Sequence, residues 1–191
     1  MSGTLGISPN MNSGTLDKWP IGHVVQAITV YPESGAKTLT NGTGATSGGG
    51  DTWAEWDSAF RITMTPRSAT NLITLTATFL HGGNASGILH HFRFANAANG
   101  NNDSIVGSTF TGSSDRTPAH GSSRMEDQDL NDVHSITITA QETAGAGART
   151  YYCQGGNEGT NSTTRYYNAT GSTSYQLAYV RPFMMVQEIQ Q

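Results

Sequence analysis

The densest group of carboxylates in the sequence lies at 126–132 and invites a calcium-binding interpretation. Asp127, Asp129 and Asn131 match the first three ligand positions of an EF-hand loop. That loop also needs Gly at its sixth position and Glu at its twelfth, and the twelfth residue here is Ile138. We therefore reject an EF-hand. A solvated acidic turn is the preferred interpretation, and a calcium site in a β-loop stays open.

A second pair of carboxylates, Glu55 and Asp57, lies on one face of a short predicted strand, beside Trp53 and Trp56. Glycoside hydrolysis uses two carboxylates that flank a cleft, and aromatic rings beside such groups are typical of sugar-binding sites. The spacing alone favours a strand with one buried tryptophan over a catalytic site. Trp53 and Trp56 are therefore the candidate ligand-binding residues, with carbohydrate as the ligand class.

Other chemistry-bearing residues predict no active site. His90 and His91 are adjacent in a predicted strand, so their side chains point to opposite faces and cannot bind the same ion. A metal shared between His90 and its symmetry copies stays open. Cys153 is the single cysteine, and an inert, packed thiol is the preferred interpretation. No nucleophile elbow, zinc-protease motif or phosphate loop is present. We expect a non-enzymatic protein with no catalytic residue, cofactor or metal.

The composition excludes several partners. Gly, Ser, Thr and Asn supply 80 of the 191 residues, only 13% are charged, and the formal net charge is −4. Nucleic-acid binding needs clustered Lys and Arg, which this chain lacks. No apolar run approaches the roughly 20 residues that span a bilayer, so we expect no membrane contact. One globular domain is the expected organisation.

Strict alternation of apolar and polar residues predicts the elements that position these side chains. At 73–79 the apolar residues occupy one parity and Thr the other, and 60–65 and 136–140 repeat the pattern. Such segments are typical of half-buried antiparallel strands. Shorter or less regular strands are predicted at 88–94, 151–154 and 166–168. The chain is thus predicted to be all-β, an antiparallel β-sandwich that is jelly-roll-like, with 95–124 as a long loop that either binds a ligand or is ordered by a partner.

The two chain ends differ from the rest because their strands are apolar on both faces. The segments are 23–31 and 183–189, and a strand of this kind must be covered on both sides. We expect the two strands to lie near each other, with the second face buried by a neighbouring subunit or by a loop of the same chain. The predicted subunit-interface residues are Val24, Ile28, Val30, Phe183, Met184, Met185 and Val186. Residues 1–20 are predicted to be an arm or attachment segment, and 21–191 the β-sandwich domain.

The order of the segments resembles a known family. It runs from the strand at 22–26, through Phe60-x-Ile-x-Met-x-Pro66 and a Thr-alternating strand, to Phe92-Arg-Phe94, then Tyr151-Tyr-x-Gln154 and a closing Val186-Gln-Glu-Ile189. This order is similar to a β-rich module of virion surface proteins of tailed phages, particularly marine and cyanobacterial ones. The likeness covers about residues 20–190.

The resemblance implies a virion part, assembled in the host cytoplasm, that forms a homotrimer and contacts other phage capsid or tail proteins. It brings no catalytic residues. No long shaft precedes the module in this sequence, so a capsid decoration protein or a short fibre or accessory tail protein is expected. The location on capsid or tail stays open. The alternative is a receptor-binding or carbohydrate-binding tip of a tail fibre, with a host surface glycan as its partner.

Overall fold

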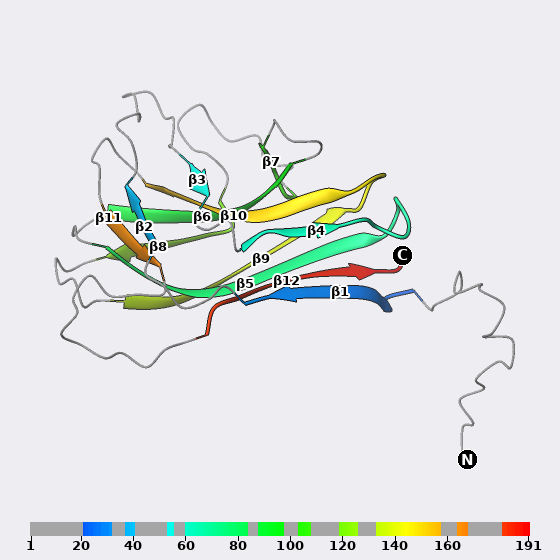
Figure 1. Cartoon of the computed structure of the whole chain (residues 1–191), viewed down its shortest axis with the longest axis horizontal. Coiled ribbons are helices and arrows are strands. Elements are labelled where there is room, and N and C mark those ends of the chain that lie inside the picture. Colours follow the sequence, from blue (N-terminus) through cyan, green and yellow to red (C-terminus); the bar gives the residue numbers. More distant parts are fainter. Residues whose placement is uncertain are drawn as a thin grey trace, which may run out of the picture.

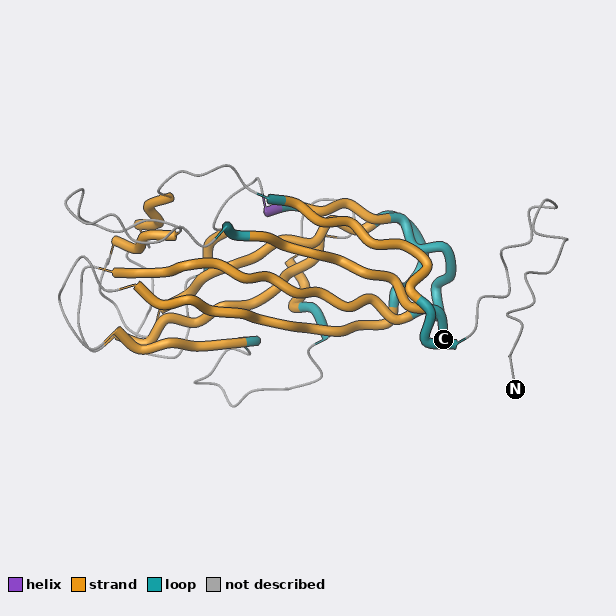
Figure 2. The backbone as a smooth tube through the Cα atoms, turned by 90° about the horizontal axis from the view of Figure 1, so that it is seen from below, coloured by secondary structure: helices purple, strands orange, loops and turns teal. Residues whose placement is uncertain are grey.

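The computed structural model describes residues 21–31, 37–40, 53–55, 60–83, 88–97, 103–107, 119–125, 133–157, 164–167 and 181–191. Within these ranges the chain consists of β-strands joined by loops and turns (Figure 2), and the strands pack in two layers (Figure 1). The predicted all-β fold class is therefore confirmed. The described residues include no helix long and apolar enough to cross a membrane.

The first layer, sheet A, is antiparallel and is built around the long strand β5. Strand β12 lies between β5 and β1 on one side, and β9 pairs with β5 on the other. Strands β11 and β2 continue the sheet beside the far end of β5. The bounds are β1 Val24–Val30, β2 Lys37–Thr40, β5 Leu72–Gly83, β9 Val133–Thr143, β11 Thr164–Tyr167 and β12 Phe183–Ile189. The expectation that the two terminal strands lie together is confirmed.

The second layer, sheet B, has β10 and β6 at its centre. Strands β3 and β4 follow one another along the outer edge of β10, and β7 and β8 do the same along the outer edge of β6. The bounds are β3 Ala54–Glu55, β4 Ile62–Met64, β6 Ile88–Ala97, β7 Asp103–Ile105, β8 Gly121–Met125 and β10 Arg149–Asn157. Each sheet is thus four strands wide.

The connections between the sheets follow a jelly roll. Sheet A reads β1-β12-β5-β9 and sheet B reads β4-β10-β6-β8. Among these eight strands, each one is followed along the chain by a strand of the other sheet, except that β6 is followed by β8 of its own sheet. This is the strand order of two interlocked Greek keys, which defines the jelly roll. The predicted architecture is confirmed.

The alternation in the sequence determines which side chains fill the space between the layers. In β5, Ile73, Leu75, Ala77 and Phe79 face the core, and the intervening Thr residues point outward. Burial of these apolar side chains drives the packing of the two sheets. The core contains Phe60, Ile62, Met64, Ile73, Leu75, Ala77, Phe79, Phe92, Phe94, Val106, Ile138, Ala140, Ala144, Tyr151, Cys153, Met184 and Val186.

The structure corrects the prediction of one long loop at 95–124. This segment contains β7 and most of β8, both paired with β6. The backbone N–H of His120, just before β8, also donates to the carbonyl of Phe92 (2.8 Å). The sequence signal was weak because strands at a sheet edge need few apolar side chains. Residues 98–102 and 108–118 of the predicted loop lie outside the described residues.

Candidate functional site

Trp53, a predicted ligand-binding residue, lies on the outer face of sheet B immediately before β3. Its ring covers Gly156 so closely that a Cβ atom there would stand 3.1–3.2 Å from three ring atoms. The Arg93 guanidinium carbon lies 4.0 Å from the ring centroid, in cation–π geometry. Arg93 is nearly buried, and its Nε donates to the side-chain oxygen of Gln154 (2.7 Å). The tryptophan therefore packs against its own sheet.

This packing limits what Trp53 offers to a sugar. The ring is half-buried and already contacts Gly156 and Arg93. Its indole nitrogen is buried and makes no hydrogen bond with the residues that the structure describes. Trp56 and Asp57 lie outside the described residues, so the predicted pairing of the two tryptophans is not tested.

Glu55, the described member of the predicted carboxylate pair, is engaged by Arg61. The guanidinium donates through Nε and NH2 to the two carboxylate oxygens, each at 2.6 Å. Arg61 also lies over the Tyr152 ring, 5.5 Å from its centroid. Both oxygens of the Glu55 carboxylate are thus occupied by the same guanidinium.

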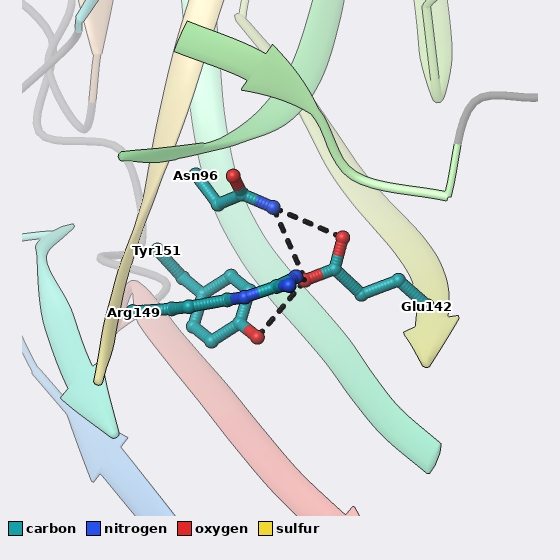
Figure 3. Close-up of polar contacts among 4 residues, drawn as sticks. All are labelled: Asn96, Glu142, Arg149 and Tyr151. Atoms are coloured by element: carbon teal, nitrogen blue, oxygen red, sulfur yellow. Dashed lines mark hydrogen bonds and ion pairs between the residues drawn. The ribbon is translucent and has the colours of Figure 1, made fainter. Parts of the chain in front are cut away.

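A second carboxylate, Glu142 of β9, is the acceptor of four hydrogen bonds (Figure 3). Asn96 Nδ2 donates to both oxygens, at 3.1 and 3.0 Å, and Arg149 NH1 (2.8 Å) and Tyr151 Oη (3.0 Å) donate to Oε1. Burial first, and then the neighbouring Glu142 charge, raise the pKa of Tyr151 well above its ordinary value. Tyr151 therefore stays protonated. The group ties β6, β9 and β10 together at one end of the core.

The third carboxylate, Glu188 of β12, is fully buried and accepts hydrogen bonds from residues of the N-terminal half of the chain. Its donors are Gln26 Nε2 (2.7 Å), Asn71 Nδ2 (2.6 Å) and the backbone N–H groups of Arg67 (2.8 Å) and Ser68 (3.2 Å). Several donors can balance the cost of burying a charge, which is otherwise high. Glu188 thus fixes the turn before β5 to the two terminal strands.

The opposite end of the core carries three histidines. The ring of His81 lies 5.3 Å from that of His90 and 5.9 Å from that of His134. His90 is buried and His91 is half-exposed, so the predicted opposite orientation is confirmed. A metal shared between His90 and its symmetry copies is ruled out, because a second copy cannot reach a side chain that is 1% exposed. The described residues contain no group of His, Cys, Asp or Glu arranged for a metal ion.

His120 joins β6 to the segment that follows β7. Its Nδ1 accepts the backbone N–H of Phe94 (3.0 Å), and its Nε2 lies 2.9 Å from the carbonyl oxygen of Val106. A carbonyl can only accept, so the neutral ring protonated on Nε2 satisfies both contacts. Burial lowers the pKa of His120, against the raising effect of the bond to Val106, and the nearby Arg93 charge lowers it further. The fold therefore holds this ring neutral.

The residues predicted to form a subunit interface fall into two groups. Met184 and Val186 are completely buried in the core of this chain, and Ile28 and Val30 pack against that core from β1. Phe183 and Met185 have the opposite parity and are half-exposed on the outer face of sheet A. Val24 is 45% exposed at the start of β1. Of the predicted interface residues, only Phe183, Met185 and Val24 therefore lie with part of their surface exposed outside the core.

Cys153 agrees with its predicted role as a packed thiol. It is fully buried, and its Sγ lies 4.0 Å from the Met184 sulfur. Burial raises the pKa of this thiol well above its ordinary value, so the reactive thiolate is disfavoured. The acidic run at 126–132 lies outside the described residues.

Comparison with protein-family models gives no match, and comparison with curated protein sequences gives no relative. What the chain does must therefore be argued from its geometry. The residues that the sequence analysis missed are Arg93, Gln154, Glu142, Glu188 and His120. One signal was available, because Glu188 shares the parity of Met184 and Val186 and must point inward with them. The described carboxylates Glu55, Glu142 and Glu188 all serve as acceptors within the fold.

Proposed function

We propose that this chain is a non-enzymatic structural protein on the exterior of a phage virion, where it assembles with other copies of itself. The jelly-roll strand order supports the proposal, because viral capsid domains often have this architecture. The resemblance in segment order, described above, points to the same class. Capsid decoration and an accessory tail position both fit.

The observation that carries the proposal is the uncharged outer face of sheet A. Within β1, β12, β5 and β9, none of its described outward side chains is ionisable: Val24, Ala27, Thr29, Phe183, Met185, Gln187, Ile189, Leu72, Thr74, Thr76, Thr78, Leu80, Ser135, Thr137, Thr139, Gln141 and Thr143. Arg181, just before β12, lies over the ring of Tyr31, just after β1, with its guanidinium carbon 4.4 Å from the ring centroid. A face of Thr, Gln and apolar groups can be buried against a neighbour without desolvating a charge. Its hydrogen bonds depend little on ionic strength, in contrast to exposed ion pairs.

The hydrogen bonds of the described carboxylates support the proposal that the protein is not an enzyme. General acid–base catalysis needs a group within reach of the substrate and free to exchange a proton. Glu142 and Glu188 are instead enclosed by donors from their own chain, and Glu55 is held by Arg61. The carbohydrate-binding alternative rests on Trp53 and Trp56, and the contacts of Trp53 add nothing in its favour.

The test is quantitative mass spectrometry on virions purified from the phage that encodes this chain. We expect the protein in the intact particle, at hundreds of copies for a capsid position or at a few to a few dozen for a tail position. Absence from the particle would overturn the proposal. The alternative is tested on a glycan array. Glycan binding that is lost in Trp53→Ala would favour the carbohydrate-binding function over the structural one.

A further inference from the structure

Strand β1 forms one edge of sheet A (Figure 1). In the part of the chain that the structure describes, its only pairing partner is β12. Gln190 donates to the His23 carbonyl (2.9 Å) and accepts from the Gly22 N–H (2.7 Å), so residue 190 is a hydrogen-bonding position of β12 toward β1. Bonding alternates along an antiparallel pair, so the backbone groups of Ala27 and Thr29 point away from β12. They face the open side of the sheet.

From Gln26 onward, the β1 edge lacks the usual protection against pairing. Proteins commonly guard an edge strand with charged residues, proline or a bulge. Val24–Val30 contains no charged residue, proline or glycine. The register shift between Val24 and Gln26 leaves the stretch from Gln26 onward regular. At the opposite edge of the sheet, in contrast, Gly107 lies so close to the Gln141 carbonyl that a Cβ would not fit.

Exposed apolar surface is concentrated at the two ends of β1. The large hydrophobic residues that are exposed in the described ranges are Ile21 (80%), Val24 (45%) and Tyr31 (51%). They lie just before β1, at its first residue and just after its last. An apolar, unpaired edge of this kind is typical of a strand that pairs with another chain.

The charge pattern selects a second copy of this chain as the partner. In a two-fold interface each residue lies close to residues of an identical strand, so any charge would be repeated against itself. Because β1 carries no charge, its pairing with itself brings no like charges together. The second copy also offers a strand of the same length with the same open backbone groups.

We propose that the edge of β1 pairs antiparallel with β1 of a second copy, so that sheet A continues across two chains. This inference rests on the proposed function, in which the protein assembles with other copies of itself. It identifies the surface through which two copies join. The pair has two-fold symmetry, so the assembly contains an even number of copies. The homotrimer implied by the family resemblance does not have this symmetry.

The experiment is sedimentation velocity at micromolar concentrations on the full chain, Ala27→Lys and Thr139→Lys. Ala27 is exposed on β1, and Thr139 is an exposed residue on β9 that serves as the matched control for adding one lysine to the same face. We expect dimers for the wild type and for Thr139→Lys. Ala27→Lys should weaken dimerisation about tenfold or more, because each copy brings a like charge to the interface. Thermal unfolding verifies that both variants are folded.

Hydrogen exchange gives an independent measurement on the unchanged protein. The amides of Ala27 and Thr29 should become protected as the concentration rises through the dimerisation range. A monomer at all concentrations, a trimer, or a dimer unaffected by Ala27→Lys would overturn the inference. If one of these outcomes is found for a protein that is present in virions, the pairing through β1 is wrong and the proposed function still stands. If the protein dimerises through β1 but is absent from virions, the proposed function is wrong and the pairing through β1 still stands.

Discussion

The outer faces of the two sheets use polar residues in opposite ways. On sheet B, charged groups are present and engaged within the chain: Arg61 binds Glu55, and Arg93 lies between Trp53 and Gln154. On sheet A, the described outward side chains carry no charge, and Thr78 and Thr137 bond through their hydroxyl groups (2.8 Å). Sheet B thus stabilises its own chain. Sheet A is left with a neutral surface that another molecule can cover at low desolvation cost.

Among the substitutions of polar residues, the largest effect is expected from Arg93→Ala on sheet B. The substitution removes the cation–π contact with Trp53 and leaves the buried Gln154 oxygen without its donor. We expect a loss of about 2–4 kcal/mol in the free energy of unfolding. Urea denaturation measures it. Arg67→Ala, at an exposed side chain, is the control. An equal loss of stability in Arg67→Ala would contradict the prediction that the contacts of Arg93 with Trp53 and Gln154 stabilise the fold.

His120→Ala should have the next largest effect, because it removes two hydrogen bonds beside β6. The expected cost is about 1–3 kcal/mol at neutral pH. The wild type should also lose stability in acid. The pKa of His120 is lower in the fold than in the unfolded chain, so the unfolded state binds the proton first. Stability from this group is complete above about pH 6.5 and falls below it.

The pH dependence of stability can be assigned to His120 by comparing the wild type with His120→Ala. Urea unfolding of the wild type and of His120→Ala is compared between pH 7.5 and 5. The variant should lose less stability over this range than the wild type. His23→Gln, at an exposed position, should keep the wild-type slope, and identical slopes for wild type and His120→Ala would contradict the assignment.

Met185→Ala tests whether side chains on the outer face of sheet A contribute less to stability than side chains in the core. Met185 points outward and is half-exposed, so its truncation should cost about 1 kcal/mol or less. Its neighbour Met184 is fully buried, and Met184→Ala should cost about 2–5 kcal/mol. Thermal unfolding at low protein concentration compares the two. Equal losses would mean that the outer face of sheet A is packed within its own chain.

The smallest effect is expected from Arg61→Ala. The Arg61 side chain is 52% exposed, and an ion pair at this exposure contributes about 0–1 kcal/mol. The difference from wild type should shrink as salt is added, since the pair is screened. Urea unfolding at low and at high salt measures this. A loss as large as that of Arg93→Ala would show that Arg61 and Arg93 contribute equally to stability.

The alternation of residue types was sufficient to predict the strands that line the core. Ile73 to Phe79 and Ile136 to Ala140 bury one parity only, and the structure confirms both. β6 was less regular in the sequence, because Arg93 and Ala95 are also buried on its outer side. A covered outer face removes the alternation on which the prediction depends.

The polar groups of the core could not be predicted in the same way. Glu188 accepts hydrogen bonds from Gln26 and Asn71, which lie far from it in the sequence. The local spacing of residue types does not indicate such contacts. Glu142 likewise depends on Asn96 and Tyr151 from two other strands. The prediction for Trp53 and Glu55 considered their own segment only. Their partners Arg93 and Arg61 come from β6 and from the residue before β4.

The position of β12 has a consequence for the synthesis of the protein. In sheet A, β12 lies between β1 and β5, and it comes after every other described strand in the chain. A chain is synthesised from its N-terminus, so the other described strands are made before the partner of β1 is available. We expect β1 to stay unpaired in sheet A until β12 has been synthesised.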